Sequence, residues 1–148
     1  MSSRVPLSLR RQVFSRAEGL CEYCLIHESD TFLGLQIEHI VSEKHGGRTV
    51  AENLAAACVF CNRFKGSDIA SLTSAGKLIR LFNPRLDLWH EHFRLDRFQI
   101  LGVSKVGQAT TGLLCFNIAD RLLERQTLIR IHRYPSPAAA GRMNSPLA

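Results

Sequence analysis

Cys21-Glu22-Tyr23-Cys24 and Cys58-Val59-Phe60-Cys61 are two C-x-x-C pairs, and the 33 residues between them decide the fold. Four thiolates in two such pairs are the usual ligand set of a closed, tetrahedral zinc site. Neither pair lies in the strand-and-helix context of a thioredoxin-like redox motif. We therefore predict that Cys21, Cys24, Cys58 and Cys61 hold a structural zinc ion, which fixes the segment between them.

Length and composition indicate a globular protein with a polyanionic partner. The chain has 148 residues, a formal net charge of +6 and 45% hydrophobic residues, but no apolar run long enough to span a membrane. The N-terminal residues lack the pattern of a secretory signal, so we expect a cytoplasmic protein without a membrane partner. The excess of basic residues fits nucleic acid, although many proteins share such a balance.

The first half of the chain predicts the order helix, strand, loop, strand, helix. Apolar residues at helical spacing predict a helix over residues 8–18. A strand is expected within residues 32–41 and a second over 53–58, with Gly46-Gly47 marking a turn between them. A helix is expected to begin at Val59 and continue towards Leu72.

The second half reads as a mixed extension. We expect a strand at 77–82, a short helix at 86–93, a strand at 98–103, and a long helix capped by Thr110 or Thr111. In that helix Leu114, Ile118 and Leu122 share one face, and Arg121 and Arg125 lie off it. Residues 135–148 are rich in Pro, Ser, Ala and Gly and are expected to be disordered. We expect a single domain over 1–134, with its core at about 8–72 and an extension at about 77–134.

The residues between the cysteines carry a specific family resemblance. They include Gln36-Ile37-Glu38-His39-Ile40-Val41, Gly46-Gly47 and Asn53-Leu54, and the run from Cys58 continues as Asn62-Arg63-Phe64-Lys65-Gly66. This pattern resembles the HNH endonucleases of the ββα-metal fold, whose motif positions would fall on His39, Asn53 and Asn62. Asn62 stands where the family's name has His, and Glu38 stands where many members have Asp.

The resemblance implies an α+β fold, in which a ββα-metal HNH core is stapled by the four-cysteine zinc site and flanked by helices and the mixed extension. It also implies hydrolysis of phosphodiester bonds, with His39 as general base. Glu38 and Asn62 offer the hard oxygen ligands that suit a catalytic Mg²⁺ or Mn²⁺ ion. In an ideal strand Glu38 and His39 point to opposite faces, so both can reach one phosphate only where the backbone bends.

The remaining candidates are less specific. Asn53 is expected to hold the loop of the hairpin, and Arg63, Lys65 and His45 are candidates for contacts with nucleic acid, which we expect to be DNA. Two rival hypotheses remain open at this point. In the first, the chain is a zinc-stabilised module that binds nucleic acid without cutting it. In the second, it is a zinc-stabilised protein-interaction domain, which would leave Glu38, His39 and Asn62 unexplained.

Overall fold

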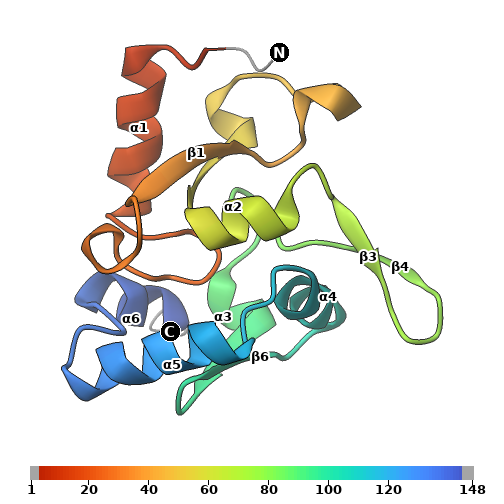
Figure 1. Cartoon of the computed structure of the whole chain (residues 1–148). Helices are drawn as coiled ribbons and strands as arrows, with labels where there is room; N and C mark the ends of the chain where they lie inside the picture. The colour runs from red at the N-terminus through yellow and green to blue at the C-terminus, as the bar shows by residue number, and fades with distance from the viewer. Residues whose placement is uncertain (1–3, 145–148) are drawn as a thin grey trace.

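The computed structural model describes residues 4–144 and shows an α+β fold with three small antiparallel hairpins (Figure 1). The elements in chain order are α1 (Leu7–Ala17), β1 (Leu35–His39), β2 (Leu54–Cys58), α2 (Val59–Lys65), β3 (Ala70–Leu72), β4 (Leu78–Arg80), α3 (Trp89–His92), β5 (Phe93–Asp96), β6 (Gln99–Gly102), α4 (Lys105–Leu113), α5 (Ala119–Arg130) and α6 (Pro137–Met143). Three short 3-10 turns lie in the loops, η1 (Glu28–Asp30), η2 (Glu43–His45) and η3 (Ala51–Asn53).

The segment between the cysteine pairs forms the predicted ββα unit. Strands β1 and β2 pair in antiparallel register from Leu35 opposite Cys58 to His39 opposite Leu54. Helix α2 follows β2 without a loop, because Cys58 serves as its N-cap, and it contacts both strands. The helix ends at Lys65 before Gly66, earlier than predicted, and residues 70–72 instead form β3 in the hairpin that projects from the body in Figure 1.

Helix α1 covers the outer side of the hairpin through a small apolar core. Val13 and Ala17 of α1 and Leu54 and Ala56 of β2 are all fully buried together. Strand β2 has five consecutive buried residues, which is expected of a strand covered on both faces. Strand β2 is therefore enclosed, whereas β1 is only half-buried.

The extension builds a second, larger core from aromatic rings. Phe93 stacks against Phe82, Trp89 and Phe116 with ring centroids 5.1 to 5.7 Å apart. This core is continuous with the buried cysteines. The predicted strands at 77–82 and 98–103 and the short helix at 86–93 are confirmed as β4, β6 and α3, each shorter than expected.

The prediction of one long helix capped by Thr110 or Thr111 is wrong, because this part of the chain forms two helices, α4 and α5. Ser104, not Thr110 or Thr111, caps α4. Cys115 has a left-handed backbone with φ of 53°, which interrupts the helix. Asn117 then binds the backbone N–H and C=O of Ile100 through its side chain. Hydrogen bonds to β6 therefore fix the break between α4 and α5, and the local sequence pattern does not predict them.

Residues 137–143 form α6, in contrast to the disordered tail that composition suggested. Ser136 caps this helix, Ala139 is fully buried and the preceding Tyr134 is 4% exposed. The Tyr134 hydroxyl donates a hydrogen bond to the carbonyl of Cys24. The small side chains of α6 pack against the rest of the chain, as the burial of Ala139 shows, so the segment forms a helix although its residues are small. Residues 145–148 of the predicted tail lie outside the described residues.

None of the helices described between residues 4 and 144 is both long enough and apolar enough to cross a membrane.

Candidate active site and metal centre

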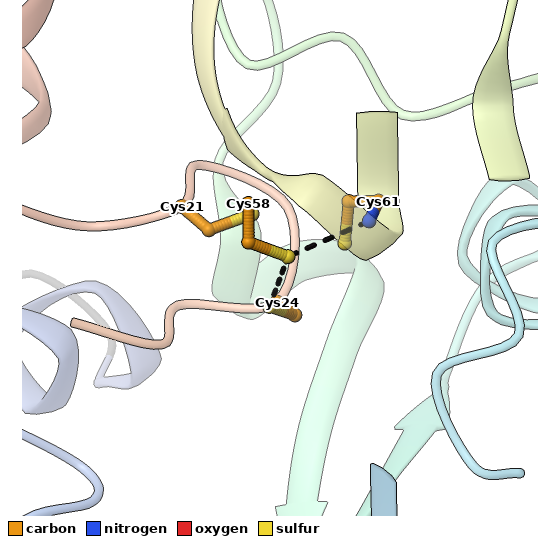
Figure 2. A group of neighbouring side chains, drawn as sticks. All are labelled: Cys21, Cys24, Cys58 and Cys61. Carbon is orange, nitrogen blue, oxygen red and sulfur yellow. Dashed lines mark hydrogen bonds between the residues drawn. The ribbon is translucent and has the colours of Figure 1, made fainter. Parts of the chain in front are cut away.

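The four cysteines of the two C-x-x-C pairs meet in one buried cluster (Figure 2). Their sulfur atoms all lie within 4.8 Å of one another. Cys21 and Cys24 come from the turn after α1, where a bridge between Leu20 and His27 closes the loop, and Cys58 and Cys61 come from the junction of β2 and α2. The cluster therefore joins the N-terminal turn to the start of the motif helix.

The geometry of the cluster fits zinc. A tetrahedral site with Zn–S bonds of about 2.3 Å has sulfur atoms about 3.8 Å apart, and the Cys24 and Cys58 sulfurs are 3.8 Å apart. All four side chains are buried, so no position is open to substrate. Burial raises the pKa of Cys21 and Cys61. A cation is what would make four thiolates tolerable in such a place.

Arg121 of α5 contacts this cluster from the extension. Its Nη2 atom donates to the Cys61 sulfur at 3.2 Å and lies 3.9 Å from the Cys58 sulfur. Burial disfavours the charged guanidinium, but the attraction of the cysteine sulfurs outweighs it and the pKa of Arg121 is raised. The prediction that Arg121 lies off the buried face of its helix is wrong, since it is 5% exposed.

Glu38 is buried and paired rather than open. Its Oε1 atom forms an ion pair with Lys65 Nζ at 2.5 Å, and its Oε2 atom accepts from the Tyr23 hydroxyl at 2.7 Å. Burial raises the pKa of Glu38, and the Lys65 charge opposes that shift. The Lys65 ammonium also donates to the carbonyls of His39 and Ile40. The Lys65 ammonium is therefore the counter-ion of the Glu38 carboxylate in this structure.

Glu38, His39 and Asn62 nevertheless line one open cavity of about 670 Å³, together with Glu43. His39 Nε2 lies 2.9 Å from the Thr49 hydroxyl and 3.7 Å from Glu43 Oε1. Asn62 donates from Nδ2 to Gln36 at 2.6 Å, which leaves its carbonyl oxygen as the ligand atom. We call this space the motif cavity. The motif cavity brings together Glu38 and His39, whose side chains would point to opposite faces of an ideal strand.

The oxygen atoms that line the motif cavity are of the chemical type that binds a hard divalent ion, but one of them already has a counter-ion. The carboxylates of Glu38 and Glu43 and the amide oxygen of Asn62 are the oxygen ligands that Mg²⁺ and Mn²⁺ prefer. Glu38, however, already has the Lys65 ammonium as its counter-ion. A divalent ion at Glu38 would have to replace that ammonium.

Asn53 holds the loop between the strands, as its expected structural role requires. Its side chain accepts from the N–H of Val41 and donates to the carbonyls of Val41 and Arg48. A Cβ atom at Gly47 would lie 1.7 Å from the Val41 carbonyl oxygen and 2.8 Å from Asn53 Nδ2. Only glycine therefore fits at position 47 beside this clamp, whereas Gly46 has open space around it and a left-handed backbone with φ of 88°.

The candidates for nucleic-acid contacts differ in accessibility. Arg63 and His45 are exposed, and neither lines the motif cavity. Lys65 is 2% exposed and pairs with Glu38, so its ammonium is turned away from solvent, and its contact with nucleic acid stays a prediction. A long cationic side chain on a helix is usually solvated, and only the buried carboxylate opposite draws Lys65 inward.

Sequence analysis did not identify five residues of the site, which are Tyr23, Gln36, Glu43, Thr49 and Arg121. Tyr23 and Gln36 stand inside the motif stretches, so their positions beside a cysteine and two residues before Glu38 were available signals. Thr49 lies in the clamped loop. Arg121 lies 60 residues from Cys61 and gives no local signal at all.

The β1–β2 hairpin, helix α2 and the four-cysteine cluster together define a ββα module of the kind that a structural zinc ion stabilises. Residues 21–68 match the family model described as HNH endonuclease, which confirms the resemblance read from the motif over that segment. The matched segment begins at the first cysteine and ends just after α2. Neither the curated proteins nor the solved structures contain a match to this chain.

Proposed function

We propose that the protein is a metal-dependent endonuclease that hydrolyses phosphodiester bonds of DNA. The observation that supports this most is the motif cavity, because it brings Glu38, His39 and Asn62 together within the segment that matches the HNH endonuclease family. A pure binding module has no need of a carboxylate, an imidazole and an amide around one opening.

In this proposal His39 is the general base. Its Nε2 atom lies 2.9 Å from the Thr49 hydroxyl and 3.7 Å from Glu43 Oε1, and in the tautomer that we propose Nε2 carries the proton, so that Nδ1 accepts a proton from water. The Glu43 carboxylate would then stabilise the imidazolium once it forms. Asn53 acts at a distance, because its clamp on Val41 fixes the end of the strand that carries His39.

Two metal ions complete the proposal. A divalent Mg²⁺ or Mn²⁺ ion held by Glu38 and Asn62 would neutralise charge on the phosphoryl oxygens. Structural zinc held by Cys21, Cys24, Cys58 and Cys61 would lock the N-terminal turn to α2. The core at 8–72 and the extension at 77–134 form one domain in this proposal, and the contact of Arg121 with the cysteines supports that arrangement.

The rival function is a zinc-stabilised module that binds nucleic acid without cutting. One observation favours it, since the Lys65 ammonium already neutralises Glu38. The two functions differ in whether a divalent ion can displace that ammonium. Purified protein should therefore be incubated with plasmid and with single-stranded DNA in Mg²⁺, Mn²⁺, Ni²⁺ or EDTA. Cleavage that requires a divalent ion supports the nuclease, and binding without cleavage under every condition supports the rival.

Single-turnover cleavage by three variants separates the base from the ligands. His39→Ala should slow cleavage by about 10² to 10⁴ and should not recover as Mg²⁺ or Mn²⁺ is raised. Glu38→Ala and Asn62→Ala should recover part of the lost rate at high metal concentration. The control is His132→Asn, at an exposed turn whose left-handed backbone Asn tolerates. A His39→Ala protein that cuts like the parent would refute the assignment of the base.

A further inference from the structure

A second cavity lies between the end of α1, α3 and α6, and shares no lining residue with the motif cavity. Its volume of about 540 Å³ is within the range of about 300 to 1,000 Å³ that is typical of small-molecule sites. Helix α6 contacts α3, and both belong to the part of the chain outside the family match. We call it the arginine cavity.

Arg16, Arg85 and Arg142 line the arginine cavity together with Glu22, and the Arg16 Nη2 atom donates to the carbonyls of Ala51 and Leu54. Glu22 Oε1 pairs with Arg85 and lies 3.7 Å from Arg142 Nη1. Its Oε2 atom accepts from the N–H of Ala56. Three positive charges therefore face one carboxylate whose two oxygens already have partners.

The other nearby acids do not cancel the remaining charge. Asp87 also lines the cavity, but its two oxygens are bound by Arg80 at 2.7 and 3.0 Å. Glu18 lies 3.4 Å from Arg142 Nη2 and its side chain is 60% exposed, so that pair is weak. The balance of Arg16, Arg85 and Arg142 against Glu22 leaves two positive charges at the cavity.

Two donors of this cluster lack acceptors. The Nε atoms of Arg16 and Arg85 are buried and have no hydrogen-bond partner within the described part of the chain. A buried donor without a partner is costly, and one on a charged group is more so. Because these Nε atoms are buried, an anion with several oxygens in the cavity would instead accept from the Nη atoms of the partly exposed Arg85 and Arg142 side chains and balance the charge of the cluster.

Part of the cavity lining is apolar and aromatic. It is formed by Phe82, Pro84, Leu88 and Trp89, and Leu88 is 52% exposed although it is a large apolar residue. Guanidinium groups beside an apolar wall match a ligand with an anionic end and a flat, weakly polar body. A nucleotide has that chemistry, because its phosphate pairs with arginine and its base packs on apolar or guanidinium surfaces.

We propose that the arginine cavity is a nucleotide-binding site, in which Arg85 and Arg142 hold the phosphate and the wall around Trp89 receives the base. The nucleotide is either free or the 5′-phosphorylated end of a strand. The proposal does not depend on the cleavage chemistry assigned to the motif cavity, since no residue is shared between the two.

The chain offers a direct reporter and a matched pair of variants. Trp89 is the single tryptophan, so its fluorescence reports occupancy of the cavity. Gly141 of α6 lines the cavity, and a Cβ atom there would meet nothing within 4 Å. Gly141→Glu and Gly141→Gln therefore add side chains of similar size without a backbone clash, and only the first adds a negative charge.

The experiment titrates the full chain with dAMP, adenosine and inorganic phosphate, without added divalent ions, and follows Trp89 fluorescence. We expect a saturable change with dAMP and weaker binding of adenosine or phosphate alone. Gly141→Glu should weaken dAMP binding by about tenfold or more relative to Gly141→Gln, because the added carboxylate repels the phosphate. Circular dichroism checks that both variants are folded.

Two further arms identify the source of the nucleotide. An oligonucleotide with a 5′ phosphate that binds more tightly than dAMP, and more tightly than its 5′-hydroxyl counterpart, indicates a strand end. Equal or tighter binding of dAMP indicates a free nucleotide. No saturable response to dAMP or to the 5′-phosphorylated strand would overturn the proposal. Equal binding by Gly141→Glu and Gly141→Gln would overturn it as well.

Discussion

Replacement of Arg121 by methionine is expected to weaken zinc binding by about 10- to 100-fold. The guanidinium is 5% exposed and its Nη2 atom lies 3.2 Å from the Cys61 sulfur and 3.9 Å from the Cys58 sulfur. A tetrathiolate zinc site carries a net charge of about −2, or about half a charge on each sulfur. Methionine keeps most of the side-chain volume and removes the compensating charge.

The magnitude follows from these two distances. At an effective dielectric constant of about 20, half a charge at such separations attracts a guanidinium by roughly 2 to 3 kcal/mol per sulfur. The buried guanidinium has given up hydration in return, which offsets part of that gain. A net loss of about 1.4 to 2.8 kcal/mol, or 10- to 100-fold in affinity, is therefore the expected result.

The control is Arg125→Met on the same helix. Arg125 is also 5% exposed, but its guanidinium donates to the carbonyls of Phe98 and Phe116 and contacts no sulfur. Both variants lose hydrogen bonds to carbonyl groups, and only Arg121→Met loses charge at the cysteines. Zinc affinity is measured by competition with a chromogenic chelator, and stability by urea unfolding. Equal losses of zinc affinity in the two variants would show that Arg121 acts through packing alone.

Three other perturbations test the same structure. Cys58→Ser should lose zinc and folded structure together, because it removes one ligand from a site whose binding is coupled to folding. Elemental analysis measures the zinc content, and circular dichroism measures the folded structure. A parent protein that is well folded without zinc would contradict this prediction. Lys65→Met should lower the free energy of unfolding in urea, without divalent ions, by about 3 to 5 kcal/mol, because Glu38 loses its buried partner, and Mn²⁺ should restore part of that stability. The control, Arg63→Met on the exposed side of α2, should change the free energy of unfolding by less than about 0.5 kcal/mol. A Lys65→Met protein as stable as the parent would refute the ion-pair argument. Deletion after Tyr134 should lower stability by about 1 to 3 kcal/mol, since it removes α6 with the buried Ala139; an unchanged melting temperature would mean that α6 contributes nothing.

The predictions that succeeded from sequence concern short-range constraints. Two C-x-x-C pairs bring four sulfurs together because each pair needs only a tight turn, and the strand before Cys58 leads directly into its helix. The amide of Asn53 and the space at Gly47 lie within one loop, so a turn signal was enough to predict their role. In these places the residue types and their spacing leave one arrangement that satisfies the chemistry.

The positions of the long charged side chains were decided only by the tertiary structure. The sequence made Lys65 a candidate for contact with nucleic acid and placed Arg121 off the apolar face of its helix. Each is buried because a group of opposite charge that is distant in sequence, Glu38 or the cysteine sulfurs, lies next to it. The break between α4 and α5 depends on Asn117 reaching β6, and α6 is ordered because the body offers a surface to its small side chains. A sequence sets the charge and length of such side chains, but the free energy of burying them depends on partners that only the folded chain brings near.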